Sequence, residues 1–292
     1  MSIYTEDLLE TTFGKKRPKS IREVAFIKYS TDGDKYYLDS DPRSNGLKHI
    51  EIKQQQLTEI EKKYYKLNTD RNVYTQLQLL PRINKNSEET LVDMLYFCGP
   101  PGSGKSYHIN QYLKCYKKIN KNNPIFIISN KTYEDNDKTY FDISPNYINS
   151  ANNETWIDVD GEEIDSFNAN DFKDCCIVFD DCLFGCDSPK IKQKVIRTID
   201  NITSNARSRN VTVIIANQKM KGGRDTQYAI ANCNLFYLFP FGDRNRCVDF
   251  VKTYVSKRKN IIDLVENTKS QFMIYSKNAP SFIMLEDQIV CL

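Results

Sequence analysis

The chain has few of the residues that build metal sites. It contains two histidines, and its nine cysteines include no C-x-x-C pair. A zinc site is therefore not expected, and we expect the cysteines to be reduced thiols. No apolar run approaches the ~20 residues of a membrane span, and the acidic N-terminus lacks the apolar core of a signal peptide. These absences predict a soluble, intracellular protein without a membrane segment.

The chain also lacks a strong excess of charge of either sign. Lysine and arginine number 41 and acidic residues 38, which gives a net charge of +3 and a pI of about 8.2. No strong overall field is implied, so any contact with nucleic acid must depend on local basic patches. With 292 residues, the chain is expected to form one large domain, or one domain with an appendage.

One glycine-rich stretch fits the phosphate-binding pattern G-x-x-x-x-G-K-[ST] at every fixed position. It reads Gly99-Pro100-Pro101-Gly102-Ser103-Gly104-Lys105-Ser106. Residues 91–98 before it predict a buried strand, and residues 107–118 after it predict a helix. A chance match in a glycine-rich turn is the alternative, and the flanking strand and helix argue against it.

The chemistry of this stretch predicts a site for a nucleoside triphosphate and Mg²⁺. Glycines let the backbone turn its N–H groups inward around phosphate oxygens, and the helix N-terminus adds partial positive charge. We expect Lys105 to reach the β- and γ-phosphates and the Ser106 hydroxyl to bind Mg²⁺. The nucleotide-binding set comprises the eight residues of the motif together with Tyr107.

From residue 90 onward, strands and helices alternate, which predicts an α/β domain with a mostly parallel sheet. Expected strands cover 124–130, 175–179, 211–216, 235–239, 272–275 and 282–285, and expected helices cover 189–207 and 246–256. The Asn- and Asp-rich stretch 146–170 is expected to be a loop-rich insertion or a weakly ordered helix, with a possible strand at 156–159.

The first 88 residues predict a small α+β appendage. Residues 22–30 and 35–39 are expected to form a hairpin, and further strands are expected at 48–54 and 73–80 with a polar helix at 55–67. Turn-rich residues 84–88 separate this appendage from the strand before the phosphate-binding loop. The domain boundaries are therefore placed at 1–88 for the appendage and 89–292 for the P-loop ATPase domain.

An apolar strand ends in the acidic pair Asp180 and Asp181, about 75 residues after Lys105. By itself such a pair is usually a strand terminus, but after a complete phosphate-binding loop it predicts the Walker B element. Asp180 is expected to hold the Mg²⁺ shell. Asp181 is expected to act as the general base that polarises the attacking water.

Two further candidates lie around the strand at 211–216. Gln218 follows its end, where an amide could sense the γ-phosphate if this strand lies between the P-loop and Walker B strands; a simple strand cap is the alternative. Arg207 and Arg209 precede the strand. Either could act on a neighbouring subunit's nucleotide as an arginine finger, and a surface helix terminus is an equal alternative.

Basic residues gather after Gln218. The loop 219–225 carries several, and others follow at Arg244, Arg246, Lys252 and 257–259. Such charges suit contacts with phosphate backbones, although a solvated face explains 257–259 equally well.

Four segments together resemble the FtsK–HerA superfamily of P-loop ATPases, most closely the poxvirus-type genome-packaging ATPases of large DNA viruses and virophages. They are GPPGSGKS, CCIVFDD, NARSRNVTVIIANQ and CNLFYLFP, within residues 90–255. Arg207, Asn210 and Gln218 fall in register with the family pattern. Ser208 stands where histidine is common, and Asp181 stands where many relatives carry glutamate.

The resemblance implies a RecA-like (ASCE) core assembled into a ring, expected to be a hexamer, that moves double-stranded DNA into a capsid. It also implies that Arg207 acts in trans, that a capsid or portal protein is a partner, and that the protein works in the host cytoplasm, a viral factory or the virion. The resulting hypothesis is an ATP-driven DNA translocase with catalytic residues Lys105, Asp181, Arg207 and Gln218.

Other functions are possible for such a core. A helicase or recombination ATPase is the hardest to exclude. A nucleoside or nucleotide kinase would need an arginine-rich lid, and the stretch 146–170 contains no arginine. A GTPase would need an N-K-x-D loop, and the Asn130-Lys131 pair lacks the aspartate. A terminase nuclease would need an acidic cluster after Gln218, and none is evident.

Overall fold

The computed structural model describes a defined part of the chain. The described residues are 3–5, 21–27, 35–39, 49–51, 77–79, 81, 92–129, 140, 143, 146–149, 156–158, 163–164, 169–182, 189–220, 224–277, 281–286 and 288–292.

The chain divides into two compact units. One comprises residues 81–268 and contains every predicted site residue, whereas the other combines residues 1–80 with 269–292. The C-terminal segment therefore groups with the N-terminal one, a division different from the boundary at 88 and 89 that composition suggests. The boundary at 88 and 89 stays a sequence-based prediction.

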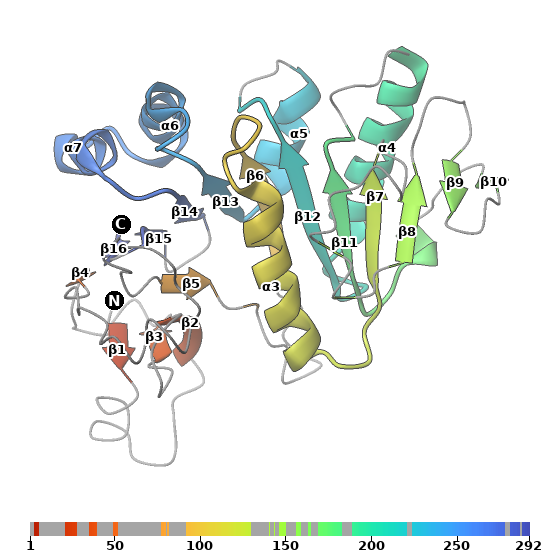
Figure 1. Cartoon of the computed structure of the whole chain (residues 1–292), viewed down its shortest axis with the longest axis horizontal. Helices are drawn as coiled ribbons and strands as arrows, with labels where there is room; N and C mark the ends of the chain where they lie inside the picture. The colour runs from red at the N-terminus through yellow and green to blue at the C-terminus, as the bar shows by residue number, and fades with distance from the viewer. Residues whose placement is uncertain are drawn as a thin grey trace, which may run out of the picture. The chain divides into compact units, whose positions relative to one another are not determined.

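The unit 81–268 alternates strands and helices along most of its length (Figure 1). Its elements are β6 (Met94–Cys98), α3 (Lys105–Ile119), β7 (Ile125–Ser129), β8 (Asn146–Asn149), β9 (Trp156–Asp158), β10 (Glu163–Ile164), the 3₁₀ turn η2 (Ala169–Asp171), β11 (Cys175–Asp180), α4 (Pro189–Asn205), β12 (Val211–Asn217), α5 (Arg224–Asn232), β13 (Leu235–Leu238), α6 (Arg244–Phe250), the π-helical turn η3 (Val251–Val255) and α7 (Lys259–Asn267).

These strands form a mostly parallel sheet in the order β10-β9-β8-β7-β11-β12-β6-β13. Strand β12 pairs in parallel with β11 on one side and with β6 on the other. The strand that precedes Gln218 therefore lies between the P-loop strand and the acidic strand, as the prediction for Gln218 required. The α/β RecA-like core predicted from the sequence is confirmed by this order.

The central strands are buried on both faces, which is why they read as continuous apolar runs. On one face Phe97 stacks on Tyr237 at 4.5 Å between ring centroids, and on the other Tyr96 meets Phe236 edge-on at 6.3 Å. Helix α3 covers one face of the sheet, and α4 and α5 cover the other (Figure 1). The loops that follow the strands lie at the sheet edge formed by their carboxyl ends.

The second unit contains two antiparallel arrangements. Strands β1 (Ile3–Thr5), β3 (Lys35–Asp39), β2 (Ile21–Ile27) and β5 (Leu77–Leu79) form one sheet in that order. Strands β14 (Met273–Ser276), β15 (Phe282–Met284), β16 (Gln288–Cys291) and β4 (His49–Glu51) pair successively. The predicted hairpin is confirmed as β2 and β3. The helix expected at 55–67 lies outside the described residues.

The structure corrects several expectations about single elements. Residues 146–149 form β8, which extends the parallel sheet beside β7, where a loop or weak helix was expected. Helix α5 begins at Arg224, inside the stretch expected to be a flexible loop, and helix α7 was not predicted. The helix expected at 246–256 is α6 followed by the π-helical turn η3. In the part of the chain that the structure describes, no helix combines the length and apolarity needed to cross a membrane.

One buried asparagine joins β13 to the P-loop strand. The Asn234 side chain accepts a hydrogen bond from the Met94 N–H at 2.9 Å and donates one to the Val92 carbonyl at 2.8 Å. The Asn234 N–H also donates to the Met94 carbonyl at 2.9 Å. The side chain thus satisfies backbone groups where the ladder between the two strands begins.

We expect Asn234→Ala to lower the free energy of unfolding by about 3 kcal/mol, because two buried backbone groups lose their partners. Asn232→Ala is the matched control, since its partly exposed amide bonds to the side chains of Asp200 and Thr203 and its loss should cost less than about 1 kcal/mol. Urea unfolding followed by circular dichroism measures both. Equal losses in the two variants would contradict this role of Asn234.

Candidate functional site: a phosphate-binding loop and an acidic strand end

The phosphate-binding loop runs from β6 into α3 and depends on its glycines. Gly102 and Gly104 adopt φ angles of 75° and 95°, which side chains rarely tolerate. A Cβ atom on Gly99 would lie 2.6 Å from Ser103 Oγ and 2.7 Å from Phe239 Cδ2, too close for any other residue. The loop therefore needs glycine for its turns and for its close approach to Phe239.

Lys105 is the first residue of α3, and its ammonium group lies inside the loop. Nζ donates to the Gly99 carbonyl at 2.7 Å and to the Pro100 carbonyl at 3.1 Å. The side chain is 8% exposed. Helix α3 begins directly at the loop, so its first N–H groups and Lys105 point positive charge at the same place, as a phosphate site requires.

Aromatic residues fix the start of α3 against β13. His108 Nδ1 and the Tyr237 hydroxyl are 2.8 Å apart, and the His108 ring packs against the rings of Tyr237 and Phe239 at 5.1 and 5.7 Å. The Tyr107 ring meets His108 edge-on at 5.3 Å and remains 46% exposed. The phosphate-binding loop is thereby anchored on its β13 side.

The acidic pair lies where β11 ends. Asp180 is 5% exposed, and Asp181 leaves the strand in the left-handed region at φ 51° with its N–H bonded to the Ala216 carbonyl at 3.2 Å. Asp181 Oδ1 is buried without a hydrogen-bond partner in the structure. A strained backbone and a buried acceptor without a partner are features that a folded chain tolerates mainly at functional sites.

The candidate sensor residue contacts the candidate base. Gln218 Nε2 lies 3.4 Å from Asp181 Oδ2, so the amide that follows β12 orients the carboxylate that follows β11. Sequence reasoning named both residues but not their contact, which arises because β12 pairs directly with β11.

Tyr96 and Asn217 hold the loop that carries Gln218, and sequence reasoning missed both roles. The buried Asn217 amide donates to the Tyr96 hydroxyl at 3.2 Å, and that hydroxyl donates to the Lys219 carbonyl at 2.9 Å. Gln218 therefore lies between two residues tied to the P-loop strand. The sequence contained a hint for Asn217, because a polar amide at the end of an apolar strand is often a functional or structural contact. It contained none for Tyr96, whose role depends on the order of the strands.

The register of three strands brings these groups to one level. Asp180 pairs with Ala216, and Asn217 pairs with Cys98 immediately before the loop. Neighbouring strands lie about 4.8 Å apart, so the ends of β6 and β11 are separated by roughly 10 Å. That gap suits a terminal phosphate together with a water molecule and a metal ion.

The two candidate arginines lie at the opposite edge of the sheet, before β12 begins. Seven residues of strand at about 3.3 Å each put Arg207 roughly 23 Å from the phosphate-binding loop of its own chain. The guanidinium of Arg209 bonds to the carbonyl and side chain of Asn170, whereas Arg207 is exposed. Asn210, at φ 56°, bonds Asp174 at 2.9 Å and fixes this turn.

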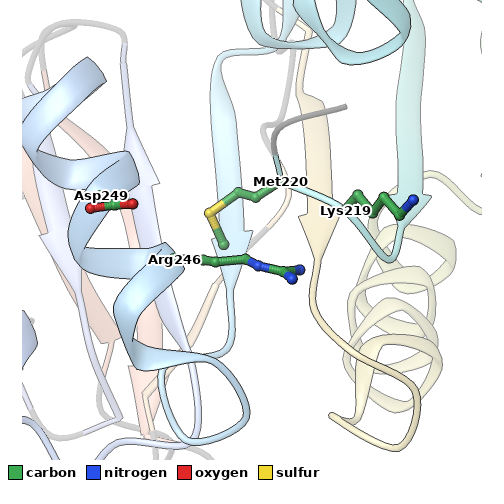
Figure 2. A pocket seen from close by; sticks show the side chains of 4 residues that line it. All are labelled: Lys219, Met220, Arg246 and Asp249. Atoms are coloured by element: carbon green, nitrogen blue, oxygen red, sulfur yellow. The ribbon is translucent and has the colours of Figure 1, made fainter. Parts of the chain in front are cut away.

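A pocket of about 260 Å³ opens between the end of β12 and helix α6, lined by Lys219, Met220, Arg246 and Asp249. Figure 2 shows Arg246 extending from the start of α6 toward the side of the pocket that carries Lys219. Arg246 also pairs with Asp243 at 3.0 Å. The lysine belongs to the loop held by Tyr96, so the pocket is connected to the segment that positions Gln218.

The residues present fit Mg²⁺ and a nucleoside triphosphate. Ser106 and Asp180 supply the hydroxyl and carboxylate oxygens that Mg²⁺ prefers. The buried Ser103 hydroxyl and Asp181 Oδ1 have no hydrogen-bond partner in the structure, and a bound phosphate or water would satisfy both. Among the described residues, no group of three or more His, Cys, Asp or Glu side chains forms a separate metal site.

No family model matches the chain. A curated relative, the uncharacterized protein V3 of Sputnik virophage, is 25% identical over 202 residues, covering 67% of this chain and 75% of the relative. The sequence resemblance named ATPases of virophages among others, and this relative is a virophage protein.

Similar solved structures include packaging proteins of Sulfolobus turreted icosahedral viruses. The DNA-packaging ATPase B204 of Sulfolobus turreted icosahedral virus has a TM-score of 0.44 and 18% identity, with 67% of this chain and 97% of that chain covered. The packaging NTPase B204 of Sulfolobus turreted icosahedral virus 2, in complex with AMPPCP, has a TM-score of 0.42 and 18% identity, with 67% and 96% covered. The pCW3 conjugation coupling protein TcpA has a TM-score of 0.42 and 11% identity, with 94% and 77% covered.

Cys98 lies directly before the loop and should resist alkylation. Burial raises the pKa of its thiol from 9.0 to about 12, with a further increase from Cys247 and a decrease from Lys105. At pH 8 the thiol is therefore protonated, and it is 1% exposed. With iodoacetamide at pH 8, we expect partly exposed Cys115 to be labelled well before Cys98 in the folded protein, and both to be labelled in urea. Peptide mapping measures this, and equal rates in the folded protein would contradict it.

Proposed function

We propose that this chain is an ATPase of the viral genome-packaging type that couples hydrolysis of Mg-ATP to movement of double-stranded DNA. The observation that carries the proposal is the contact between Gln218 and Asp181 at the level of the phosphate-binding loop. A nucleotide-binding loop alone would suit many functions. A half-buried carboxylate oriented by an amide beside it suits hydrolysis.

Each residue has a separate role in the proposed reaction. Lys105 and the N–H groups of the loop bind the triphosphate and stabilise charge on its transferring end. Asp181 Oδ1 accepts a proton from water as the water oxygen attacks the γ-phosphorus, and the bond to ADP breaks. Gln218 holds the Asp181 carboxylate in place. When bound between Ser106 and Asp180, Mg²⁺ neutralises negative charge on the β- and γ-phosphates.

The position of Arg207 supports a site completed by another copy of the chain. It lies at the sheet edge away from its own loop and is exposed, so it can reach a nucleotide only in trans. Arg209 is held by Asn170, which favours Arg207 as the finger. A closed ring, which we propose to be a hexamer, supplies such a contact at every interface.

DNA contact is proposed for the two cations that line the pocket between β12 and α6. Lys219 and Arg246 offer charge to backbone phosphates without base-edge geometry, which suits sequence-independent movement. Because Lys219 directly follows Gln218 in the chain, a shift of Gln218 on hydrolysis would also move the Lys219 backbone. A capsid or portal protein is the proposed partner that directs the DNA.

Lys105→Ala should lower the ATPase rate at least about 1,000-fold, because charge on the transferring phosphate loses its main cation. Phosphate release is measured with and without double-stranded DNA, alongside the mass of the assembly in the presence of nucleotide. Full activity in the variant would refute the site. A wild-type monomer whose rate ignores DNA would refute the motor, and phosphate transfer to an acceptor other than water would favour a kinase.

Arg207→Ala should retain ATP binding but lose about 1,000-fold in hydrolysis, because the neighbouring site loses its finger. Co-expression of Arg207→Ala with Lys105→Ala should restore partial activity, since mixed interfaces contain an intact loop opposite an intact Arg207. Arg209→Ala is the matched control and should keep most of its activity. Mixed assemblies as inactive as either parent would contradict action in trans.

A further inference from the structure

An exposed phenylalanine lies beside the phosphate-binding loop. Phe241 is 78% exposed, the largest value among the large apolar side chains of the described residues, ahead of Tyr107 at 46% and Tyr254 at 41%. A single exposed aromatic ring is common on protein surfaces, so the significance of this one depends on where the chain holds it. Phe241 has no role in the hydrolysis proposed above.

The segment that carries Phe241 is a tight turn between β13 and α6. The N–H groups of Gly242 and Asp243 both donate to the Phe239 carbonyl at 3.1 Å, and the Asp243 side chain accepts from the Arg246 N–H at the start of α6. The turn is thus closed by backbone bonds at its base and capped where the helix begins. Phe241 lies at its tip.

This turn contacts the phosphate-binding loop on both sides of Phe241. The Phe239 ring fills the space where a Gly99 side chain would lie, and a Cβ atom on Gly242 would come within 3.0 Å of Pro100 Cγ. The residues before and after Phe241 are therefore fixed against the loop. The exposed ring between them is positioned at the rim of the nucleotide site.

The direction of the bound triphosphate follows from the strand order. The groups proposed to act on the γ-phosphate, Asp181 and Gln218, follow β11 and β12 on one side of β6. Strand β13 lies on the other side of β6. A triphosphate whose terminal end faces Asp181 therefore has its nucleoside end toward the turn after β13. This step depends on the proposed ATPase function.

We propose that Phe241 is the residue on which the base of the nucleotide stacks. The ring offers an apolar face without hydrogen-bonding groups, so it recognises the flat surface of a purine rather than its edge. The site would then bind phosphates through the loop and the base through Phe241. Selectivity between adenine and guanine is not expected from this contact.

Nucleotide binding to the full chain tests the proposal. Equilibrium constants are measured by calorimetry for ATP and for inorganic tripolyphosphate, which has no base. We expect Phe241→Ala to weaken ATP binding about tenfold and to leave tripolyphosphate binding unchanged. Tyr254→Ala removes another exposed aromatic ring, one packed on Phe250 after α6, and should bind both ligands like the wild type.

A tryptophan at this position gives a second readout. The chain has one tryptophan, Trp156, so Phe241→Trp in a Trp156→Phe background reports from the turn alone. Stacking predicts that ATP and GTP quench its fluorescence, that tripolyphosphate does not, and that ATP affinity stays within about threefold of the wild type. Quenching by tripolyphosphate to the same extent would contradict stacking.

The outcomes separate this proposal from the function on which it rests. ATP binding by Phe241→Ala equal to that of the wild type, or equal losses of ATP and tripolyphosphate binding, would overturn the role of Phe241 while leaving the ATPase intact. Failure of the wild type to bind either ligand, or unchanged binding by Lys105→Ala, would instead refute the nucleotide site itself.

Discussion

The parallel pairing of β12 between β6 and β11 is the constraint on which the rest of the site depends. Parallel strands end at the same sheet edge, and this register sets the phosphate-binding loop, Gln218 and Asp181 at one level. Each strand is buried on both faces, so a slip in register would displace a continuous apolar surface and break its ladder of hydrogen bonds. The geometry of the candidate site is therefore fixed by the stability of the sheet rather than by the loops themselves.

Different kinds of contact support the two sides of the candidate site. On the β12 side, a buried hydrogen bond from Asn217 to Tyr96 and a partly buried one from Tyr96 to Lys219 hold the segment with Gln218. On the β13 side, support is aromatic, with Phe239 packed against Gly99 and Gly104. The hydrogen bonds on the β12 side hold Gln218 and Asp181, the residues proposed to act at the γ-phosphate. The apolar side suits the nucleoside, and the proposed stacking on Phe241 extends it.

The two edges of the sheet have separate tasks in the proposed motor. The carboxyl edge binds and hydrolyses the nucleotide, while Arg207 is exposed at the amino edge roughly 23 Å away. A single chain cannot close that distance. In the proposed motor, hydrolysis in one subunit therefore requires Arg207 of a neighbouring subunit. The chemistry of one subunit then depends on the position of the next. In the proposed motor, the pocket lined by Lys219 and Arg246 lies next to Gln218 in the chain and would link the same event to DNA.

The sequence by itself determined the nucleotide-binding loop, the acidic pair and the alternation of strands and helices, because these depend on local patterns: glycine spacing, apolar runs and the residues that end them. It also placed β2 and β3 in a hairpin. The tertiary structure decided what depends on residues far apart. Such features include the contact between Gln218 and Asp181, the bonds of Arg209 to Asn170, and the packing of Phe239 and Gly242 against Gly99 and Pro100. Strand β8, expected to be loop or weak helix, forms because β7 offers it an edge to pair with. Tertiary pairing can override weak local preference, and no local pattern records which edges are available.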